Sequence, residues 1–239
     1  MAYQAVFKRY ELKYMLNEAQ KQLILSAMDG HMKLDDYGET IIRNLYYDTD
    51  DYRLIRRSME KPVYKEKLRI RSYRRAGIDD PVYVELKKKY KHVVYKRRLQ
   101  MPEGEALKWL AQGEAAPQDS QIAREITYFR DFYKGLKPKV FLSYHRLAYY
   151  DLEGSSFRVT FDTEICARQQ DLTLDSEPGG TSLLPEGMTL MELKCAGAMP
   201  LWMAHALNEG KIYKTSFSKY GTAFATMIFP QMKEEKQDA

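Results

Sequence analysis

The chain has 239 residues, of which 44% are hydrophobic and 30% are charged, and its formal net charge is +5. This is the composition of an ordinary globular protein, long enough for one large domain or two small ones. The modest positive charge permits an anionic partner without requiring one. The only cysteines, Cys166 and Cys195, lack the spacing of a zinc site, which argues against structural zinc and predicts free thiols in a reducing compartment.

Membrane and targeting signals are absent from the pattern. No uncharged run approaches the roughly 20 residues needed to cross a bilayer. The first residues, MAYQAVFKRYELKY, lack the apolar core of a signal peptide. We therefore expect a cytoplasmic protein.

The N-terminal part predicts a strand, a helix, a second strand and a short helix. Residues 6–15 alternate, with Glu11 and Lys13 on one face. Asn17 then opens an amphipathic helix that ends near Gly30. A strand over 40–47 and a short basic helix over 52–59 follow, separated by the turn sequence DTDD.

The next stretch, KEKLRIRSY, lies in a strand predicted over 63–75. With a period of two, one face carries the four cations Lys65, Lys67, Arg69 and Arg71, and the other carries Tyr64, Leu68 and Ile70. A hairpin turn at 76–81 leads to a strand over 82–89, and a third charged strand covers 91–101. The charged faces of the three strands hold Lys65, Lys67, Arg69, Arg71, Glu85, Lys87 and Lys96. The register of the third strand is ambiguous, because Arg97 and Arg98 are adjacent and cannot share a face.

Two helices, over 103–112 and 121–134, precede three more strands over 139–150, 157–165 and 188–195. Their polar faces hold Tyr144, Arg146, Arg158, Thr160, Asp162, Glu164, Glu192 and Lys194.

The C-terminal part predicts helices over 200–210 and 219–229, and a frayed tail from Gln231 onward. The composition does not change along the chain in a way that would mark a domain boundary, so we expect a single domain over 1–239.

About eight segments are therefore predicted strands, and at least six place ionisable residues on one face only. An antiparallel sheet of that size can close on itself and enclose the charged face, with the helices covering the apolar outside. The expected fold class is α+β, with an antiparallel eight-stranded β-barrel and flanking helices. Unpaired enclosed cations are costly, and the few carboxylates offset only part of them.

A linear polyphosphate fits this excess of enclosed cations. It offers many oxygens to Arg and Lys, and a divalent metal held by carboxylates would bridge it. The implied chemistry is phosphoryl transfer, which depends on positioning and charge neutralisation. No GxxxxGK[ST] loop is present, which argues against a P-loop nucleotidase.

The ordered set YELK, KLRIRSY, VELKKK, SYHRLAY, FRVTFD, MELK and SFSKY resembles the polyphosphate polymerase domain of the vacuolar transporter chaperone (VTC) family. That family lies within the triphosphate tunnel metalloenzyme, or CYTH-like, superfamily. The resemblance covers about 7–225. It implies an eight-stranded tunnel that transfers the terminal phosphate of ATP to a growing polyphosphate chain with Mn²⁺ or Mg²⁺.

Carried over motif by motif, the resemblance implies a set of site residues. Those assigned to phosphate binding and catalysis are Lys13, Arg69, Arg71, Lys87, Lys96, Arg146, Arg158 and Lys219. Tyr144, Ser218, Lys67 and Lys194 would contact the substrate chain. Glu192 would hold the metal, with Glu11 and Glu85 as further candidates.

The sequence departs from the wider superfamily at its first motif. An ExExK pattern would place glutamate at position 9, where this chain has Arg9 before Glu11 and Lys13. This disfavours thiamine triphosphatase or adenylate cyclase chemistry and favours the polymerase branch. The regulatory SPX domain and membrane helices that accompany the family's polymerase are not expected here, although membrane-associated partner proteins are compatible with the resemblance.

Three alternatives stay open. The cationic strands could be solvated faces, and Glu85 or Glu192 could form ion pairs without binding metal. The same scaffold could serve as a metal-dependent triphosphatase or short-chain polyphosphatase. A non-catalytic module could bind polyphosphate or a nucleic acid, although the near balance of acidic and basic residues argues against nucleic acid.

Overall fold

The computed structural model describes residues 10–91 and 93–237. Within them one sheet contains ten strands, eight of which follow one another in the order β1-β10-β8-β7-β3-β4-β5-β6. Every pairing is antiparallel, as expected. Residues 6–9, including Arg9, and His92 lie outside the described residues.

The strands run over β1 (Tyr10–Leu16), β2 (Met32–Leu34), β3 (Thr40–Asp48), β4 (Tyr64–Ser72), β5 (Pro81–Tyr90), β6 (Val93–Pro102), β7 (Lys137–Asp151), β8 (Arg158–Arg168), β9 (Thr181–Ser182) and β10 (Thr189–Cys195). The helices are α1 (Glu18–Met28), α2 (Arg53–Met59), α3 (Glu103–Ala111), α4 (Gln121–Tyr133), α5 (Leu201–Glu209), α6 (Lys219–Ala223), the π-helix η1 (Phe224–Ile228) and α7 (Phe229–Gln237). The short strands β2 and β9 were not predicted.

The sheet curls but does not close, so the expectation of a fully closed barrel is wrong. In the described residues β1 and β6 are the unpaired ends of the strand order. The free side of β1 is instead occupied by the segment before α6, where Tyr14 bridges Lys214 and the Thr215 N–H donates to the Lys13 carbonyl over 2.7 Å. The curl still brings β1 close to β5, because Glu11 and Lys87 form an ion pair of 2.9 Å. The result is a tunnel-like sheet with a seam.

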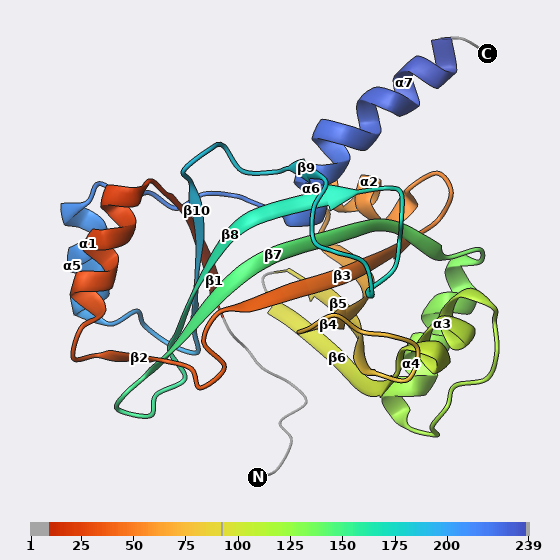
Figure 1. Cartoon of the computed structure of the whole chain (residues 1–239), viewed down its shortest axis with the longest axis horizontal. Helices are drawn as coiled ribbons and strands as arrows, with labels where there is room; N and C mark the ends of the chain where they lie inside the picture. Colours follow the sequence, from red (N-terminus) through yellow and green to blue (C-terminus); the bar gives the residue numbers. More distant parts are fainter. Residues whose placement is uncertain (1–9, 92, 238–239) are drawn as a thin grey trace.

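Two groups of helices cover the outer apolar face, as the alternation predicts. Helices α1 and α5 pack on β1, β8 and β10, and Leu16, Ile24 and Met203 lie in that cluster. Helices α3 and α4 pack on β4, β5 and β6 at the opposite end of the molecule (Figure 1), where Trp109 is fully buried. Asn17 and Gln20 form the capping box that begins α1.

A third apolar cluster lies on the inner face, which the sequence pattern did not predict. Here α2, α6 and η1 pack against β3 and β7 through Tyr46, Leu142, Tyr220 and Phe224. The fully buried Asp48 fixes this arrangement, since its carboxylate accepts from the N–H groups of Leu54 and Ile55 and from the Tyr220 hydroxyl. These helices fill part of the tunnel and bring the start of α6 to its charged part.

Some predicted boundaries need correction. Strand β4 ends at Ser72 rather than at 75. The tail predicted to fray continues as α7 to Gln237 and projects from the body (Figure 1). Pro230 lies in the first turn of α7, directly after the π-helix η1 in one continuous helical segment, and its missing N–H interrupts the i→i−4 bonding there. Glu164 does not share the inner face with Asp162, because a bulge between Ser143 and His145 shifts the register and turns Glu164 toward His145.

Candidate functional site: the charged inner face

The first group of inner charges, the Glu85 cluster, comprises Glu85, Arg69, Arg71, Lys96 and Arg98. Glu85 is 1% exposed, with Arg69 at 2.7 Å and Lys96 at 2.6 Å. Arg98 lies at 3.3 Å and Arg71 at 3.9 Å. One carboxylate on β5 thus faces four cations from the two flanking strands, β4 and β6, which leaves an excess of positive charge.

Burial and charge oppose each other in this cluster. Burial raises the pKa of Glu85, but Arg69, Arg71 and Lys96 outweigh it and hold that pKa well below its usual range. Burial lowers the pKa of Lys96 to about 7, although Glu85 opposes the shift. Glu85 is therefore ionised, and the charge of Lys96 responds to anything that adds negative charge beside it.

Neutral side chains fix the two arginines of β4. The Arg69 guanidinium donates to the Tyr46 hydroxyl over 2.8 Å. Arg71 donates to Asn44 Oδ1 and to the Tyr144 hydroxyl, each over 3.0 Å. Since these contacts come from β3 and β7, the guanidinium groups are held in place before any substrate arrives.

The second group, the Asp162–Glu192 cluster, comprises Asp162, Glu192, Lys13, Arg146 and Lys219. Arg146 makes a bidentate pair with Asp162, with both N–O distances at 2.6 Å. Lys219 lies 2.5 Å from Asp162 and 3.1 Å from Glu192, and Lys13 lies 3.1 Å from Glu192. Asp162 is fully buried and Glu192 is 7% exposed.

The cations of this cluster keep both carboxyl groups ionised. Burial raises the pKa of Glu192, but Lys219, Lys13 and Arg146 hold it well below its usual range. The pKa of Asp162 is lowered for the same reason, with Arg146 and Lys219 outweighing burial. Burial lowers the pKa of Lys219, but Asp162 and Glu192 raise it above its usual value. Lys219 is thus a permanent cation.

Helix α6 carries Lys219 into the tunnel. Ser218 caps the helix by accepting from the Gly221 N–H over 3.1 Å, and its hydroxyl also accepts from Lys67 Nζ over 2.9 Å. Tyr220 anchors the same turn on Asp48 and stacks on Tyr46. The position of Lys219 therefore depends on contacts with β3 and β4.

Less strongly paired cations lie between the two clusters. Burial, with Lys87 and Lys13 nearby, lowers the pKa of Lys67 to about 7. Burial and Arg146 lower the pKa of Lys194 to about 8. Burial raises the pKa of Glu11, but Lys87 and Lys194 bring it down to about 2. An anion entering here would stabilise the charged forms of the lysines.

The structure brings most of the predicted site residues together on one face. They are Glu11, Lys13, Lys67, Arg69, Arg71, Glu85, Lys87, Lys96, Tyr144, Arg146, Glu192, Lys194, Ser218 and Lys219. Tyr144 connects the clusters, because its hydroxyl accepts from Arg71 while Arg146 and Lys219 lie over its ring at 5.1 and 4.5 Å.

Two predicted residues lie at the edge of this face. Lys65 is half-buried and donates to the Ser58 carbonyl. Arg158 is exposed at the start of β8, opposite Lys194 and Tyr150 in register. Its role as a phosphate ligand stays a prediction.

The carboxylates differ in how well they suit a divalent metal. No group of three or more His, Cys, Asp or Glu side chains with metal-binding geometry occurs in the described part of the chain. Mg²⁺ is typically bound by one or two carboxylates together with substrate phosphates. Glu192 and Glu11 fit that pattern, because they lie on paired strands and the charge of Glu192 acts on Glu11. Glu85 fits it less well, because its charged neighbours among the described residues are four cations and no second carboxylate.

The sequence reasoning gave no role to several residues of this face. Alternation placed Asp162 inside, whereas the register of the strand with Arg98 was ambiguous, and the bonding partners of both residues come from other strands. Thr160, opposite Glu192 in register, has a buried hydroxyl without a hydrogen-bond partner. Only the tertiary structure identifies these contacts.

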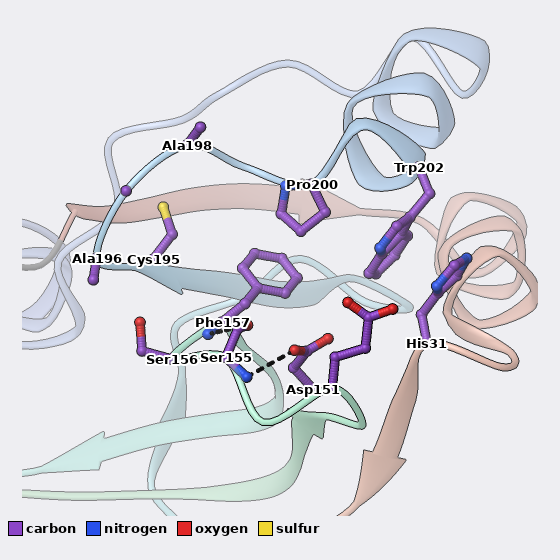
Figure 2. Close-up of a pocket in the computed structure, with 12 residues that line it drawn as sticks. His31, Asp151, Ser155, Ser156, Phe157, Cys195, Ala196, Ala198, Pro200 and Trp202 are labelled. Atoms are coloured by element: carbon purple, nitrogen blue, oxygen red, sulfur yellow. Dashed lines mark hydrogen bonds between the residues drawn. The ribbon is translucent and has the colours of Figure 1, made fainter.

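A separate pocket of about 380 Å³ lies outside this face, between the β7–β8 turn and the start of α5 (Figure 2). His31 stacks on Trp202, and Phe157 meets Trp202 edge to face. Asp151 and Glu153 also line the pocket, and no Lys or Arg does. Its acidic lining does not suit a polyphosphate, so the inner face of the sheet is the better candidate site for a phosphate ligand.

The curled antiparallel sheet with a charged inner face is the α+β, tunnel-like architecture that the resemblance implies. The VTC domain family model matches residues 8–228, and the chain belongs to that family. No curated protein matches the chain in sequence.

Solved structures share the fold at low sequence identity. A candidate adenylate cyclase from Bacillus halodurans is 16% identical, with a TM-score of 0.56, over 90% of this chain and 96% of the other. A candidate adenylyl cyclase from Hippeastrum, described as having a dominant triphosphatase activity, is 17% identical, with a TM-score of 0.56, over 92% and 96% of the two chains. No helix among the described residues is both long and apolar enough to span a membrane.

Proposed function

We propose that this protein is a polyphosphate polymerase that transfers the terminal phosphate of ATP onto a growing inorganic polyphosphate chain within a single domain. The observation that carries the proposal is the inner face, where two ion clusters hold more cations than carboxylates. A chain of phosphates supplies the missing negative charge along the whole face. Nucleic acid is not an expected partner, because base recognition is not needed for this charge match.

The residues of the face act by holding phosphates in line. Arg69, Arg71 and Arg146 offer planar, permanently charged forks that suit phosphate oxygens. Their partners Glu85 and Asp162 fix them beforehand, so little reorganisation accompanies charge development during transfer. Lys219, from α6, adds a permanent charge beside Tyr144.

A divalent ion, Mn²⁺ or Mg²⁺, would be held by Glu192 and Glu11 together with substrate oxygens, and when bound it would neutralise phosphate charge. Lys13 pairs with Glu192 over 3.1 Å. With Glu192 bound to a metal ion instead, Lys13 would be available to bind a phosphate. Membrane-associated partner proteins fit the family, and the product chain would pass to them.

A second candidate is a metal-dependent triphosphatase or short-chain polyphosphatase. The tunnel fold is shared with the Hippeastrum protein described by its triphosphatase activity. Water could replace the acceptor phosphate without any change in the cations that bind the donor. The two functions therefore differ in their acceptor alone.

The test is to incubate the purified protein with ATP and Mn²⁺ and to resolve polymer, ADP and free phosphate. Polymer formation that is lost in Glu192→Gln and retained in Glu153→Gln, an exposed carboxylate of the separate pocket, supports the polymerase. Orthophosphate as the only phosphate product would establish the second candidate. Absence of turnover and of tripolyphosphate binding would contradict both.

A further inference from the structure

The inner face changes from cationic to aromatic at one end of two neighbouring strands, β4 and β5. Along β4 the inward residues run Lys67, Arg69, Arg71, and Tyr73 follows just beyond the strand. Along β5, Lys87 and Glu85 give way to Tyr83, which pairs with Arg71 in register. Cations thus yield to aromatic rings at the same end of both strands.

These rings form a cluster with Arg98 and Arg71. Tyr73 and Tyr83 meet edge to face with centroids 5.6 Å apart. The Arg98 guanidinium lies 3.5 Å from the Tyr83 centroid and donates to the Tyr73 hydroxyl over 2.9 Å. Arg71 lies 5.9 Å from the Tyr73 centroid. Tyr73 therefore stands directly beside two guanidinium groups of the Glu85 cluster.

Tyr73 is 40% exposed, whereas Tyr83 is covered by Arg98. A continuous polyphosphate gains nothing from an aromatic ring, because it has no apolar or π surface. A nucleobase does, since stacking on an aromatic side chain favours any base. A ligand with phosphates at one end and a flat ring at the other matches this change from arginine to tyrosine.

We infer that Tyr73 is the nucleoside subsite of the tunnel, so that the base of a nucleoside triphosphate stacks on Tyr73 while its phosphates extend past Arg71 and Arg69. This inference rests on the proposed function and adds the orientation of the nucleotide in the tunnel. The nucleoside lies at the tyrosine end, and the terminal phosphate points toward Lys67 and Lys87. Arg98 holds the Tyr73 ring through its hydroxyl.

The test compares ATP with inorganic tripolyphosphate, which carries the same phosphates without the nucleoside. Dissociation constants are measured by calorimetry with EDTA present, so that no phosphate is transferred. We expect Tyr73→Ala to weaken ATP binding about tenfold and to leave tripolyphosphate binding within about twofold. Tyr73→Phe keeps the ring and should retain ATP binding.

Tyr90→Ala is the matched control, because Tyr90 is an exposed tyrosine at the far end of β5 with its side chain on the opposite face. It should change neither constant. Equal losses for both ligands in Tyr73→Ala, or no loss for ATP, would overturn the subsite. Wild-type protein that binds tripolyphosphate as tightly as ATP would also overturn it and leave the proposed function standing. Failure to bind either ligand would instead overturn the proposed function.

Discussion

The two ion clusters of the inner face are built in different ways. The Glu85 cluster draws its residues from β4, β5 and β6, which are joined by short hairpins, so strand register alone brings them together. The Asp162–Glu192 cluster needs β1, β7, β8, β10 and α6. The first is excess positive charge around one carboxylate, and the second is a nearly balanced set that ties α6 to the sheet. The first cluster is therefore poised for an anion, whereas the second also anchors α6.

The largest difference between the two clusters should appear in the stability of Lys219→Met. The substitution leaves the buried Asp162 and Glu192 with fewer cations, so we expect the free energy of unfolding to fall by about 3–5 kcal/mol. Urea denaturation measures this. Lys194→Met is the control, since Lys194 lies 3.9 Å from Glu192 and should cost less than about 1 kcal/mol. Equal losses in the two variants would contradict the anchoring role of Lys219.

Glu85→Gln should have a smaller effect with a distinctive rescue. Removing the charge leaves four cations facing one another, and we expect a loss of about 2–3 kcal/mol of stability. Tripolyphosphate should then raise the melting temperature of the variant more than that of the wild type, because it supplies the missing charge. Thermal unfolding with and without the anion decides this. Equal shifts would show that the anion does not reach the Glu85 cluster.

Lys67 predicts a pH dependence. Its folded pKa of about 7 lies below the unfolded 10.5, because burial and the cations Lys87, Lys13, Lys65 and Arg69 disfavour its charge. Between these values the unfolded chain holds a proton that the folded chain lacks. The destabilisation of the free protein by Lys67 is therefore complete below pH 7, where this lysine is charged in both states. It decreases as the pH rises from about 7 to 10.5, so the stability increases over that range.

Anion binding should respond in the opposite direction. A bound phosphate favours charged Lys67, so tripolyphosphate affinity should fall about tenfold between pH 7 and pH 9. Lys67→Arg, which stays charged, should show a flatter profile. Calorimetric titration at several pH values checks this, and identical profiles for the two proteins would exclude Lys67 as the titrating group.

The smallest effect is expected outside the tunnel. Arg75 pairs with Asp175 and Glu177 at 2.8 and 3.0 Å, but all three side chains are more than half exposed. Arg75→Ala should therefore shift the urea midpoint of unfolding only slightly, if at all, and leave tripolyphosphate affinity unaltered. A larger loss in urea denaturation would mean that the loop it holds supports the tunnel.

The strand pattern allowed much of this site to be predicted. Alternation placed Lys67, Arg69 and Arg71 on one face, because side chains two apart in a strand must share a side. It failed at Glu164, since a bulge shifts the register and no periodicity records it. Closure of the barrel also failed, because the edge of β1 pairs with the segment around Lys214, a contact between residues about two hundred positions apart.

The sequence by itself determined which side chains face inward and that they are mostly cations, since both follow from local periodicity and residue type. The tertiary structure alone decided which cation meets which carboxylate. Asp162 is held by Arg146 and Lys219, and Lys219 enters the tunnel only because Tyr220 is bonded to Asp48. Such pairings depend on the curl of the sheet and the packing of α6, and no spacing along the chain encodes them.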